Sequence, residues 1–258
     1  MDLDLKGKSA LVCGSSQGIG LAAARELALL GANITLFARN ETLLNEVKNS
    51  LDDSKGQHHS VLVADFSDND AVRAIINVHN EYHILVNNTG GPPAGKAIDA
   101  DEIEFIQAFK NHLVNNQIIA GALVPYMKKE SYGRIVNIIS TSVKAPIPGL
   151  GVSNTIRGAV NSWSKTLANE LGEYGITVNN VLPGATNTVR LASIIENKAT
   201  KLGRSVGEIE NNMKAEIPAK RFAEASEVAA AEAFLASPAA GYVNGISIAV
   251  DGGRTGCL

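Results

Sequence analysis

The stretch Gly14-Ser15-Ser16-Gln17-Gly18-Ile19-Gly20 decides the fold of this chain, because it joins the apolar run 9–13 to an alanine-rich segment. The run predicts a buried strand, and the segment after it predicts a helix. Glycines in such a turn let the backbone approach a pyrophosphate, while the helix N-terminus offers free N–H groups and partial positive charge. The turn therefore predicts a dinucleotide phosphate site, and a simple tight turn is the alternative.

Short apolar runs alternate with longer amphipathic segments along the whole chain. The expected strands are 9–13, 34–37, 61–63, 84–86, 135–139, 178–182 and 246–250. The expected helices are 19–30, 41–51, 69–78, 100–128, 152–171 and 226–236. Several strand runs are continuously apolar, as in strands covered on both faces. This alternation predicts right-handed βαβ units and one α/β domain, a doubly wound parallel sheet of the Rossmann type.

Composition narrows the class of protein. The 258 residues are 45% hydrophobic and 19% charged, which indicates a globular chain. A net charge of −3 argues against nucleic-acid binding. The two cysteines, Cys13 and Cys257, form no disulfide framework and suit a reducing compartment. With no signal-peptide profile at the start and no apolar stretch long enough to span a bilayer, we expect a cytoplasmic protein without membrane contact.

Two stretches interrupt the alternation, and both follow predicted strand ends. They are the glycine- and proline-rich segment 90–95 and the polar segment 187–221, which we expect to be irregular. In open α/β sheets, ligands bind outside the carboxyl ends of the strands. The second segment is long enough to form a lid over a substrate, although a surface insertion is the alternative.

The end of the second strand indicates which dinucleotide binds. Sites that prefer NAD(H) place a carboxylate there for the ribose 2′-hydroxyl, but this chain has Ala38 followed by Arg39. Without a carboxylate to repel a 2′-phosphate, and with Arg39 to pair with one, NADP(H) is favoured over NAD(H). Asp65 is predicted to bind the adenine amino group. Asn88 and Gly90, after the fourth strand, are predicted to line the adenine ribose and the pocket floor.

Taken together, these motifs resemble the short-chain dehydrogenase/reductase family over nearly the whole chain, with β-ketoacyl-acyl carrier protein reductases the most similar members. The further matching motifs are Asn87-Asn-Thr-Gly90, Arg134–Ser140, Val178-Asn-Asn-Val-Leu-Pro-Gly184 and Gly245–Gly253. The resemblance implies that Pro183, Gly184 and Thr188 hold the nicotinamide carboxamide. It also implies a homo-oligomer, a tetramer or a dimer, packed through the C-terminal strand. A small carbonyl or hydroxyl compound is the implied substrate, and no metal is expected.

The catalytic positions of that family are where the chain departs from the pattern. The family uses Asn, Ser, Tyr and Lys, and the matching positions here are His112, Ser140, Ser153 and Arg157. None of the five tyrosines has a lysine four residues later, so no shifted copy of the motif exists.

The substitutions leave three functions open. A serine hydroxyl is far less acidic than tyrosine, and loss of a positioned acid typically costs roughly 10²–10⁴ in rate. Arg157 keeps the positive charge and can bind ribose or stabilise an oxyanion, but it does not relay protons. The chain is thus predicted to be an NADP(H)-dependent reductase whose proton comes from His112 or water. The alternatives are an inert NADP(H)-binding sensor or assembly partner, and non-redox chemistry in the same pocket.

Overall fold

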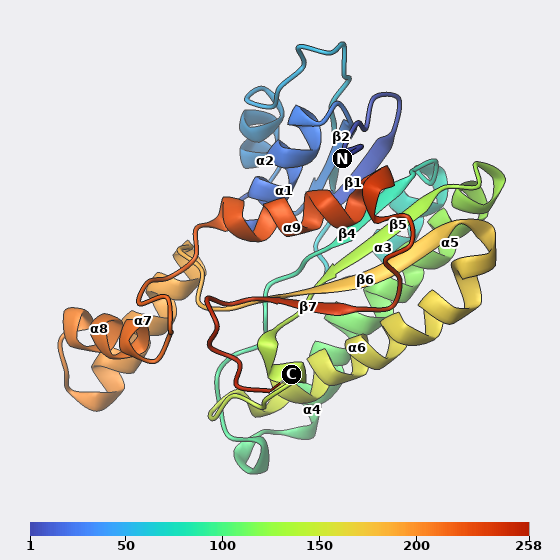
Figure 1. Cartoon of the computed structure of the whole chain (residues 1–258). Coiled ribbons are helices and arrows are strands. Elements are labelled where there is room, and N and C mark those ends of the chain that lie inside the picture. Colours follow the sequence, from blue (N-terminus) through green and yellow to red (C-terminus); the bar gives the residue numbers. More distant parts are fainter. Residues whose placement is uncertain (258) are drawn as a thin grey trace.

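A computed structural model describes residues 1–257 and contains one seven-stranded parallel sheet in the order β3-β2-β1-β4-β5-β6-β7 (Figure 1). The strands are β1 (Ser9–Cys13), β2 (Asn33–Ala38), β3 (Ser60–Val63), β4 (Ile84–Asn87), β5 (Gly133–Ile138), β6 (Ile176–Pro183) and β7 (Ser247–Val250). Each pair of neighbouring strands is parallel, so the predicted doubly wound sheet is confirmed.

Helices cover both faces of the sheet. They are α1 (Gly18–Leu29), α2 (Glu41–Lys48), α3 (Asn69–Val78), α4 (Glu102–Phe109), α5 (Asn115–Lys129), α6 (Gly151–Leu171), α7 (Val189–Leu202), α8 (Val206–Ala215) and α9 (Ala225–Ala236). Each face of the sheet has its own hydrophobic core. Side chains of α1, α2 and α9 pack on one face, and those of α3, α5 and α6 pack on the other. Within β1 the two faces alternate, because Val12 belongs to the first core and Leu11 to the second.

The switch point of the sheet lies between β1 and β4. Chain connections run outward from this point in both directions, so the loops after β1 and β4 leave a crevice between them. Register places Val12 beside Val86 in the two strands, and their carboxyl ends therefore lie at the same edge. The glycine-rich turn and the Asn87–Gly90 motif consequently meet there.

The expected helix 100–128 is present, but it is not a regular α-helix throughout. The structure begins α4 at Glu102 and interrupts the helical path with a π-helical turn, Lys110–Val114, before α5. A π turn holds one extra residue and is frequent at functional sites.

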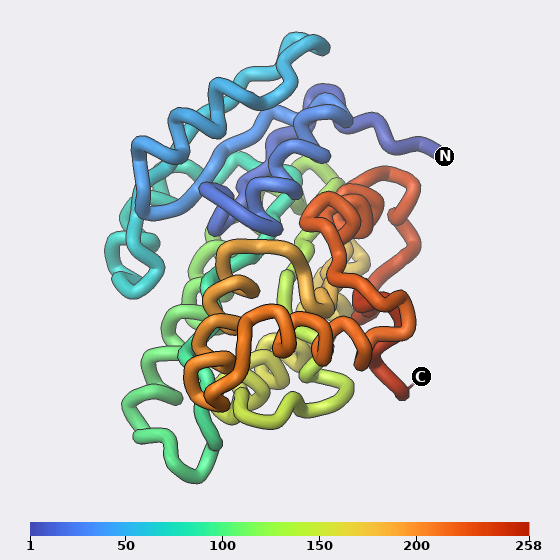
Figure 2. Tube along the Cα trace, turned by 90° about the vertical axis from the view of Figure 1, so that its left-hand side faces the viewer, coloured from blue at the N-terminus to red at the C-terminus, as the bar shows by residue number. Residues whose placement is uncertain are grey.

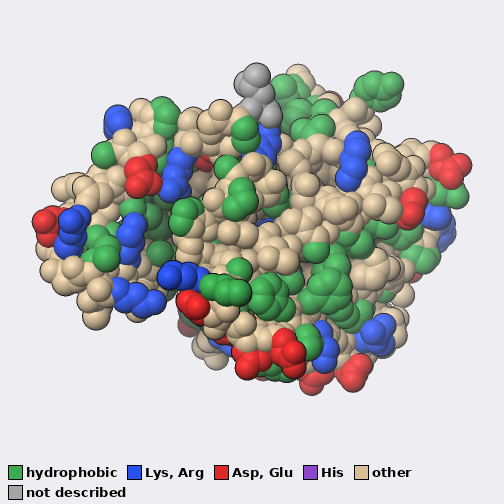
Figure 3. All heavy atoms as spheres, turned by 90° about the horizontal axis from the view of Figure 1, so that it is seen from below, with side chains coloured by type: hydrophobic (Ala, Val, Ile, Leu, Met, Phe, Trp, Pro, Cys, Tyr) green, Lys and Arg blue, Asp and Glu red, His purple; other side chains and the backbone are tan. Residues whose placement is uncertain are grey.

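The expected irregular stretch 187–221 is also wrong, because it contains α7 and α8. Their apolar faces form a small core of their own that includes Leu191, Ile195 and Ile209. Helix α8 begins with a capping box in which Ser205 and Glu208 bond reciprocally. Figure 2 shows this helical pair in front of the carboxyl edge of the sheet. In Figure 3, Lys and Arg side chains lie at the end of the molecule where Figure 1 places α7 and α8.

No helix within 1–257 combines the length and apolar character needed to cross a membrane. Over the same residues, no group of three or more His, Cys, Asp or Glu side chains is arranged to hold a metal ion.

Candidate active site

The glycine-rich turn is packed too tightly for side chains at two of its glycines. A Cβ on Gly14 would lie 2.5 Å from the backbone oxygen of Asn88, and Gly14 has a φ of +58°. A Cβ on Gly20 would clash with the carbonyl oxygen of Gly14. The Asn88 side chain donates to that same carbonyl at 3.2 Å. Asn88 therefore supports the turn from β4, and the turn keeps its backbone exposed to a ligand.

The N-terminus of α1 has the free donors that a phosphate requires. Gln17 is its N-cap and forms no side-chain capping bond, and the first turn carries no acidic residue. The N–H groups at this end are thus available for an anion. The side chain of Ser15 joins the turn to β2, because its buried hydroxyl accepts a hydrogen bond of 3.0 Å from the Phe37 N–H.

Arg39 and Asp65 lie together at the ends of β2 and β3. The Arg39 Nη1 atom is 3.7 Å from the Asp65 carboxylate, and the Arg39 side chain is 79% exposed. The pKa of Asp65 is lowered, chiefly by the hydrogen bond from the Ser67 backbone N–H at 2.8 Å. Asp65 is therefore an ionised acceptor, and the exposed guanidinium can move to a 2′-phosphate at modest cost.

Arg157 links α6 to the strand that carries Ser140. Its buried guanidinium donates through Nη1 to the carbonyl of Ile138 at 2.9 Å. Ser140 lies two residues beyond Ile138, where its hydroxyl accepts from the Ser142 N–H at 3.1 Å. Ser153 precedes Arg157 by one helical turn and shares its face of α6. The structure thus brings Arg157 to the carboxyl end of β5, two residues before Ser140, with Ser153 one turn earlier on the same face of α6.

His112 lies in the π-helical turn and points to the end of β4. Its Nδ1 atom is 2.6 Å from the Thr89 hydroxyl, in the Asn87–Gly90 motif. Burial, and then the positive charge of Arg157, lower the pKa of His112 to about 3. The imidazole is therefore neutral near pH 7, which weakens its predicted role as a donor of its own proton. It can still form hydrogen bonds as a neutral ring.

Comparison with known proteins agrees with this geometry. A family model described as Enoyl-(Acyl carrier protein) reductase matches residues 14–255. The chain belongs to the short-chain dehydrogenase/reductase family. The uncharacterized oxidoreductase YvrD of Bacillus subtilis is 33% identical over 98% of this chain and 98% of its own length. The 3-oxoacyl-[acyl-carrier-protein] reductase FabG of Haemophilus influenzae is 32% identical, over 96% of this chain and 98% of its length.

Solved structures of the same family superimpose over the whole chain. L-sorbose reductase from Gluconobacter frateurii, complexed with NADPH and L-sorbose, has a TM-score of 0.93 and 30% identity, and both chains are covered completely. YwfH, an NADPH-dependent reductase of bacilysin biosynthesis, has a TM-score of 0.91 at 29% identity, with 97% of this chain and 99% of YwfH covered. The predicted membership of the short-chain dehydrogenase/reductase family is confirmed.

The remaining predicted residues of this short-chain dehydrogenase/reductase lie between β6 and α7. Gly184 packs so closely that a Cβ would lie 2.7 Å from Cα of Asp251. Thr188 is the N-cap of α7 and accepts from the Leu191 N–H at 3.3 Å. Its methyl group would lie 3.4 Å from a Cβ on Gly18, so the start of α7 adjoins the glycine-rich turn.

One residue of the site was missed by sequence reasoning. Arg190, in the first turn of α7, donates through Nη2 to the Pro92 carbonyl at 3.0 Å and so reaches the 90–95 loop. That loop is itself held beside the start of α6, because the Gly95 N–H donates to the Gly149 carbonyl and the Gly151 N–H donates to the Gly95 carbonyl. The N-cap Thr188 was the signal that a helix starts here, and Arg190 then faces the pocket from it.

Proposed function

We propose that this protein is an NADP(H)-dependent oxidoreductase that reduces a small carbonyl compound or oxidises the matching alcohol. The observation that carries the proposal is the position of Arg157. Its bond to Ile138 sets the Ser153 face of α6 against the Ser140 end of β5, one strand away from the switch point. This is the edge at which a doubly wound sheet binds its ligands.

The residues present fit NADP(H). The tight glycine-rich turn, held by Asn88, and the free N-terminus of α1 suit the pyrophosphate. Arg39 would pair with the 2′-phosphate, with Asp65 at the adenine. Thr188 would hold the carboxamide. The binding of NADPH by the Gluconobacter frateurii reductase, which is similar over its full length, supports this assignment.

The chain's own side chains then have distinct roles. The hydroxyls of Ser140 and Ser153 would hold the carbonyl oxygen, and Arg157 would bind ribose and stabilise negative charge on that oxygen. When bound, NADPH supplies the hydride to the carbonyl carbon and is oxidised to NADP⁺. The oxygen would take up a proton from water, which solvent would reprotonate, because the pKa of His112 of about 3 leaves no imidazolium to donate one. His112 and Thr89 would order that water.

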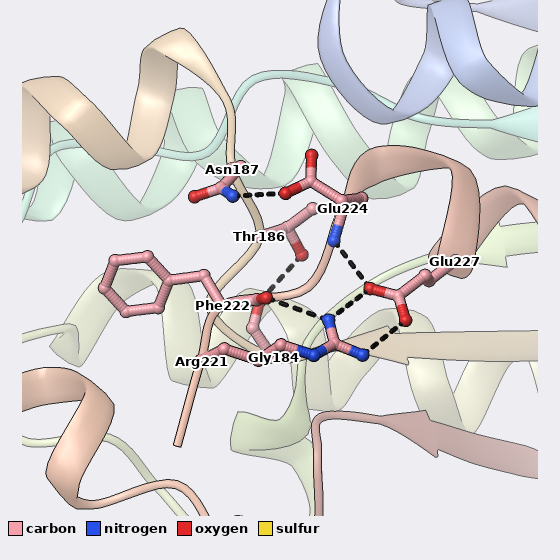
Figure 4. A network of polar contacts seen from close by, with 7 residues as sticks. All are labelled: Gly184, Thr186, Asn187, Arg221, Phe222, Glu224 and Glu227. Carbon is pink, nitrogen blue, oxygen red and sulfur yellow. Dashed lines mark hydrogen bonds and ion pairs between the residues drawn. The ribbon is translucent and has the colours of Figure 1, made fainter. Parts of the chain in front are cut away.

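The chain enters and leaves the α7–α8 pair at a single place, as it would in a lid. Both ends of the segment leave the body at one place, where Asn187 and Ala223 are joined by a backbone bond of 2.8 Å. Figure 4 shows the same stem closed by side chains, with Asn187 bonded to Glu224 and Arg221 paired to Glu227. We propose that α7 and α8 move on this stem to cover the substrate.

A homo-oligomer is also part of the proposal. Helices α5 and α6 border a groove of about 550 Å³ whose lining includes Phe109, Leu113 and Trp163. Exposed Ile103 and Ile106 extend the apolar surface along α4. Apolar patches of this kind mark protein interfaces. Light scattering after gel filtration should therefore give the mass of a dimer or a tetramer.

The test is NADPH oxidation by the purified protein against ketones, quinones and β-ketoacyl thioesters, with NADPH binding measured in the same preparation. Turnover of any member, abolished by Arg157→Ala, is the expected result. Tight NADPH binding without turnover of any carbonyl would contradict the proposal and favour an inert NADP(H)-binding protein.

A further inference from the structure

Two arginines face one small space beside the proposed catalytic groups. A Cβ on Gly91 would lie 3.6 Å from Nη2 of Arg190 and 3.8 Å from Nη2 of Arg157. The two guanidinium groups come from different elements, α7 and α6, and flank the same position of the 90–95 loop, at Gly91. Like charges placed this close repel each other, so the arrangement costs free energy unless an anion joins it.

No acidic side chain offsets these charges. Among the described residues, every ion pair lies elsewhere, and neither Arg157 nor Arg190 takes part in one. Arg157 is only 9% exposed, and its one hydrogen bond goes to a neutral carbonyl. Burial, and then the charge of Arg190, lower the pKa of Arg157 to about 10, so it stays positive at pH 7. A buried unpaired cation of this kind calls for an anionic partner.

The proposed cofactor leaves this charge unpaired. Its phosphates would sit at the N-terminus of α1, after β1, whereas Arg157 is anchored to β5. In the sheet, β5 is two strands away from β1, a separation of roughly 10 Å. The ribose near Arg157 offers only neutral hydroxyls. We therefore assign an anion that reaches Arg157 as well as Arg190 to the substrate.

We propose that Arg157 and Arg190 form an anion subsite beneath Gly91, and that the substrate is a small carbonyl or hydroxy compound carrying a carboxylate or a phosphate. This inference rests on the proposed oxidoreductase function. Planar guanidinium groups pair with either anion through two parallel hydrogen bonds. The lid adds long-range attraction: segment 187–221 has seven Lys and Arg against four Glu, in a chain whose net charge is −3.

The first experiment measures binding to NADP⁺-loaded protein, in which no ketone can be reduced. The ligands are three matched pairs: acetoacetate and methyl acetoacetate, levulinate and methyl levulinate, and dihydroxyacetone phosphate and dihydroxyacetone. Saturation-transfer NMR should show at least one anion bound tenfold or more tightly than its neutral partner, with a preference that weakens at high salt. Equal binding in all three pairs would overturn the inference.

Two variants test whether the preference for anions over their neutral partners comes from this subsite. Arg190→Ala should reduce that preference roughly 10- to 100-fold. Gly91→Ala should do the same without harming the fold, because the new methyl would meet only the two guanidinium groups, at ordinary contact distances. The matched controls are Arg204→Ala, at the other end of α7, and Gly95→Ala, whose Cβ would have no neighbour within 4 Å. Both controls should retain the preference.

The outcomes separate this inference from the proposed function. If Arg190→Ala leaves the preference intact and weakens NADP⁺ binding instead, Arg190 serves the cofactor phosphates and the inference is wrong. If the protein oxidises NADPH with neutral ketones and shows no anion preference, the inference fails while the oxidoreductase stands. If anions bind through Arg190 but no carbonyl is turned over, the proposed function fails and the subsite stands.

Discussion

In the β1–α1 turn, position is fixed by backbone contacts, whereas the pocket beyond β4 is held by long side chains that cross between elements. Gly14 and Gly20 are set by close approach of main-chain atoms, including those of Asn88. Arg157 and Arg190 instead reach the carbonyls of Ile138 and Pro92 from separate helices. The first kind of site tolerates almost no substitution, while the second can change its chemistry by exchanging side chains and keep its frame.

The largest effect should come from restoring the family's tetrad residues. Ser153→Tyr combined with Arg157→Lys should raise the reductase rate by roughly 10²–10⁴, because a phenol beside an ammonium is a competent acid. The assay is NADPH oxidation on a ketone that the wild type reduces slowly. The control is Ser153→Phe with Arg157→Lys, which adds the ring without the hydroxyl. Equal rates for the two double variants would show that no acid was missing.

On the backbone side, Gly14→Ala should weaken NADPH binding on the order of 100-fold, because its Cβ meets the main chain of β4. Fluorescence titration with NADPH measures this loss. Gly7→Ala is the matched control, since Gly7 also has a positive φ, +79°, but its Cβ would have no neighbour within 4 Å. It should cost about 1 kcal/mol of stability and leave binding unchanged. If both variants bind alike, close approach is not the reason for Gly14.

The same contrast explains what the sequence could predict. All seven strands and the glycine-rich turn were predicted, because apolar runs and turn glycines are local signals. The α7–α8 pair was missed because its apolar residues are few, although Leu191, Ile195 and Ala199 recur at helical spacing and Ser205 caps α8. A local pattern therefore identified the frame of the molecule better than the α7–α8 pair.

The pocket was predicted less well, because side chains meet there across distant segments. Ser140, Ser153 and Arg157 were placed by resemblance, and their meeting at the end of β5 follows from one long-range hydrogen bond. Arg190 had no signal of its own, since one arginine in a polar segment is usually a solvated charge. Its role depends on reaching Pro92, 98 residues away in the sequence. Such a contact cannot be read from spacing.

Helix α9 packs in the same apolar core as α1, yet it carries one buried carboxyl group. Glu232 is fully buried, and neither of its carboxylate oxygens has a hydrogen-bond partner within residues 1–257. Burial raises the pKa of Glu232 well above its usual range, so the folded protein keeps a proton that the unfolded chain releases. Stability must then fall as the pH rises above the unfolded value near 4.5, by up to about 1.4 kcal/mol per pH unit.

Glu232→Gln should remove that slope, and Glu232→Leu should also raise the stability at pH 7. Urea unfolding between pH 5 and pH 8 measures both. Glu227→Gln, on the same helix, is the control, because the contribution of Glu227 changes only below about pH 4.5 and the variant should leave the slope between pH 5 and pH 8 unchanged. The hydrogen bond from Arg221 is the main cause that lowers the pKa of Glu227 to about 2, so its contribution disappears as the pH falls. An unchanged slope in Glu232→Gln would mean that the carboxyl is not protonated in the fold.

The smallest effect concerns His112 and bears on the pocket. Because the pKa of His112 is about 3, the folded protein stays neutral there while the unfolded histidine takes up a proton below pH 6.5. Stability should therefore decline as the pH falls from 6.5 toward 3, and His112→Asn should reduce the decline, whereas His79→Asn at the exposed end of α3 should not.

The rate profile of the wild type should show no step near pH 6.5, and the rate of His112→Asn at pH 7 should change less than about tenfold. A step that disappears in His112→Asn would instead make His112 the proton donor, and the pocket would then hold a titrating acid as well as its two fixed cations.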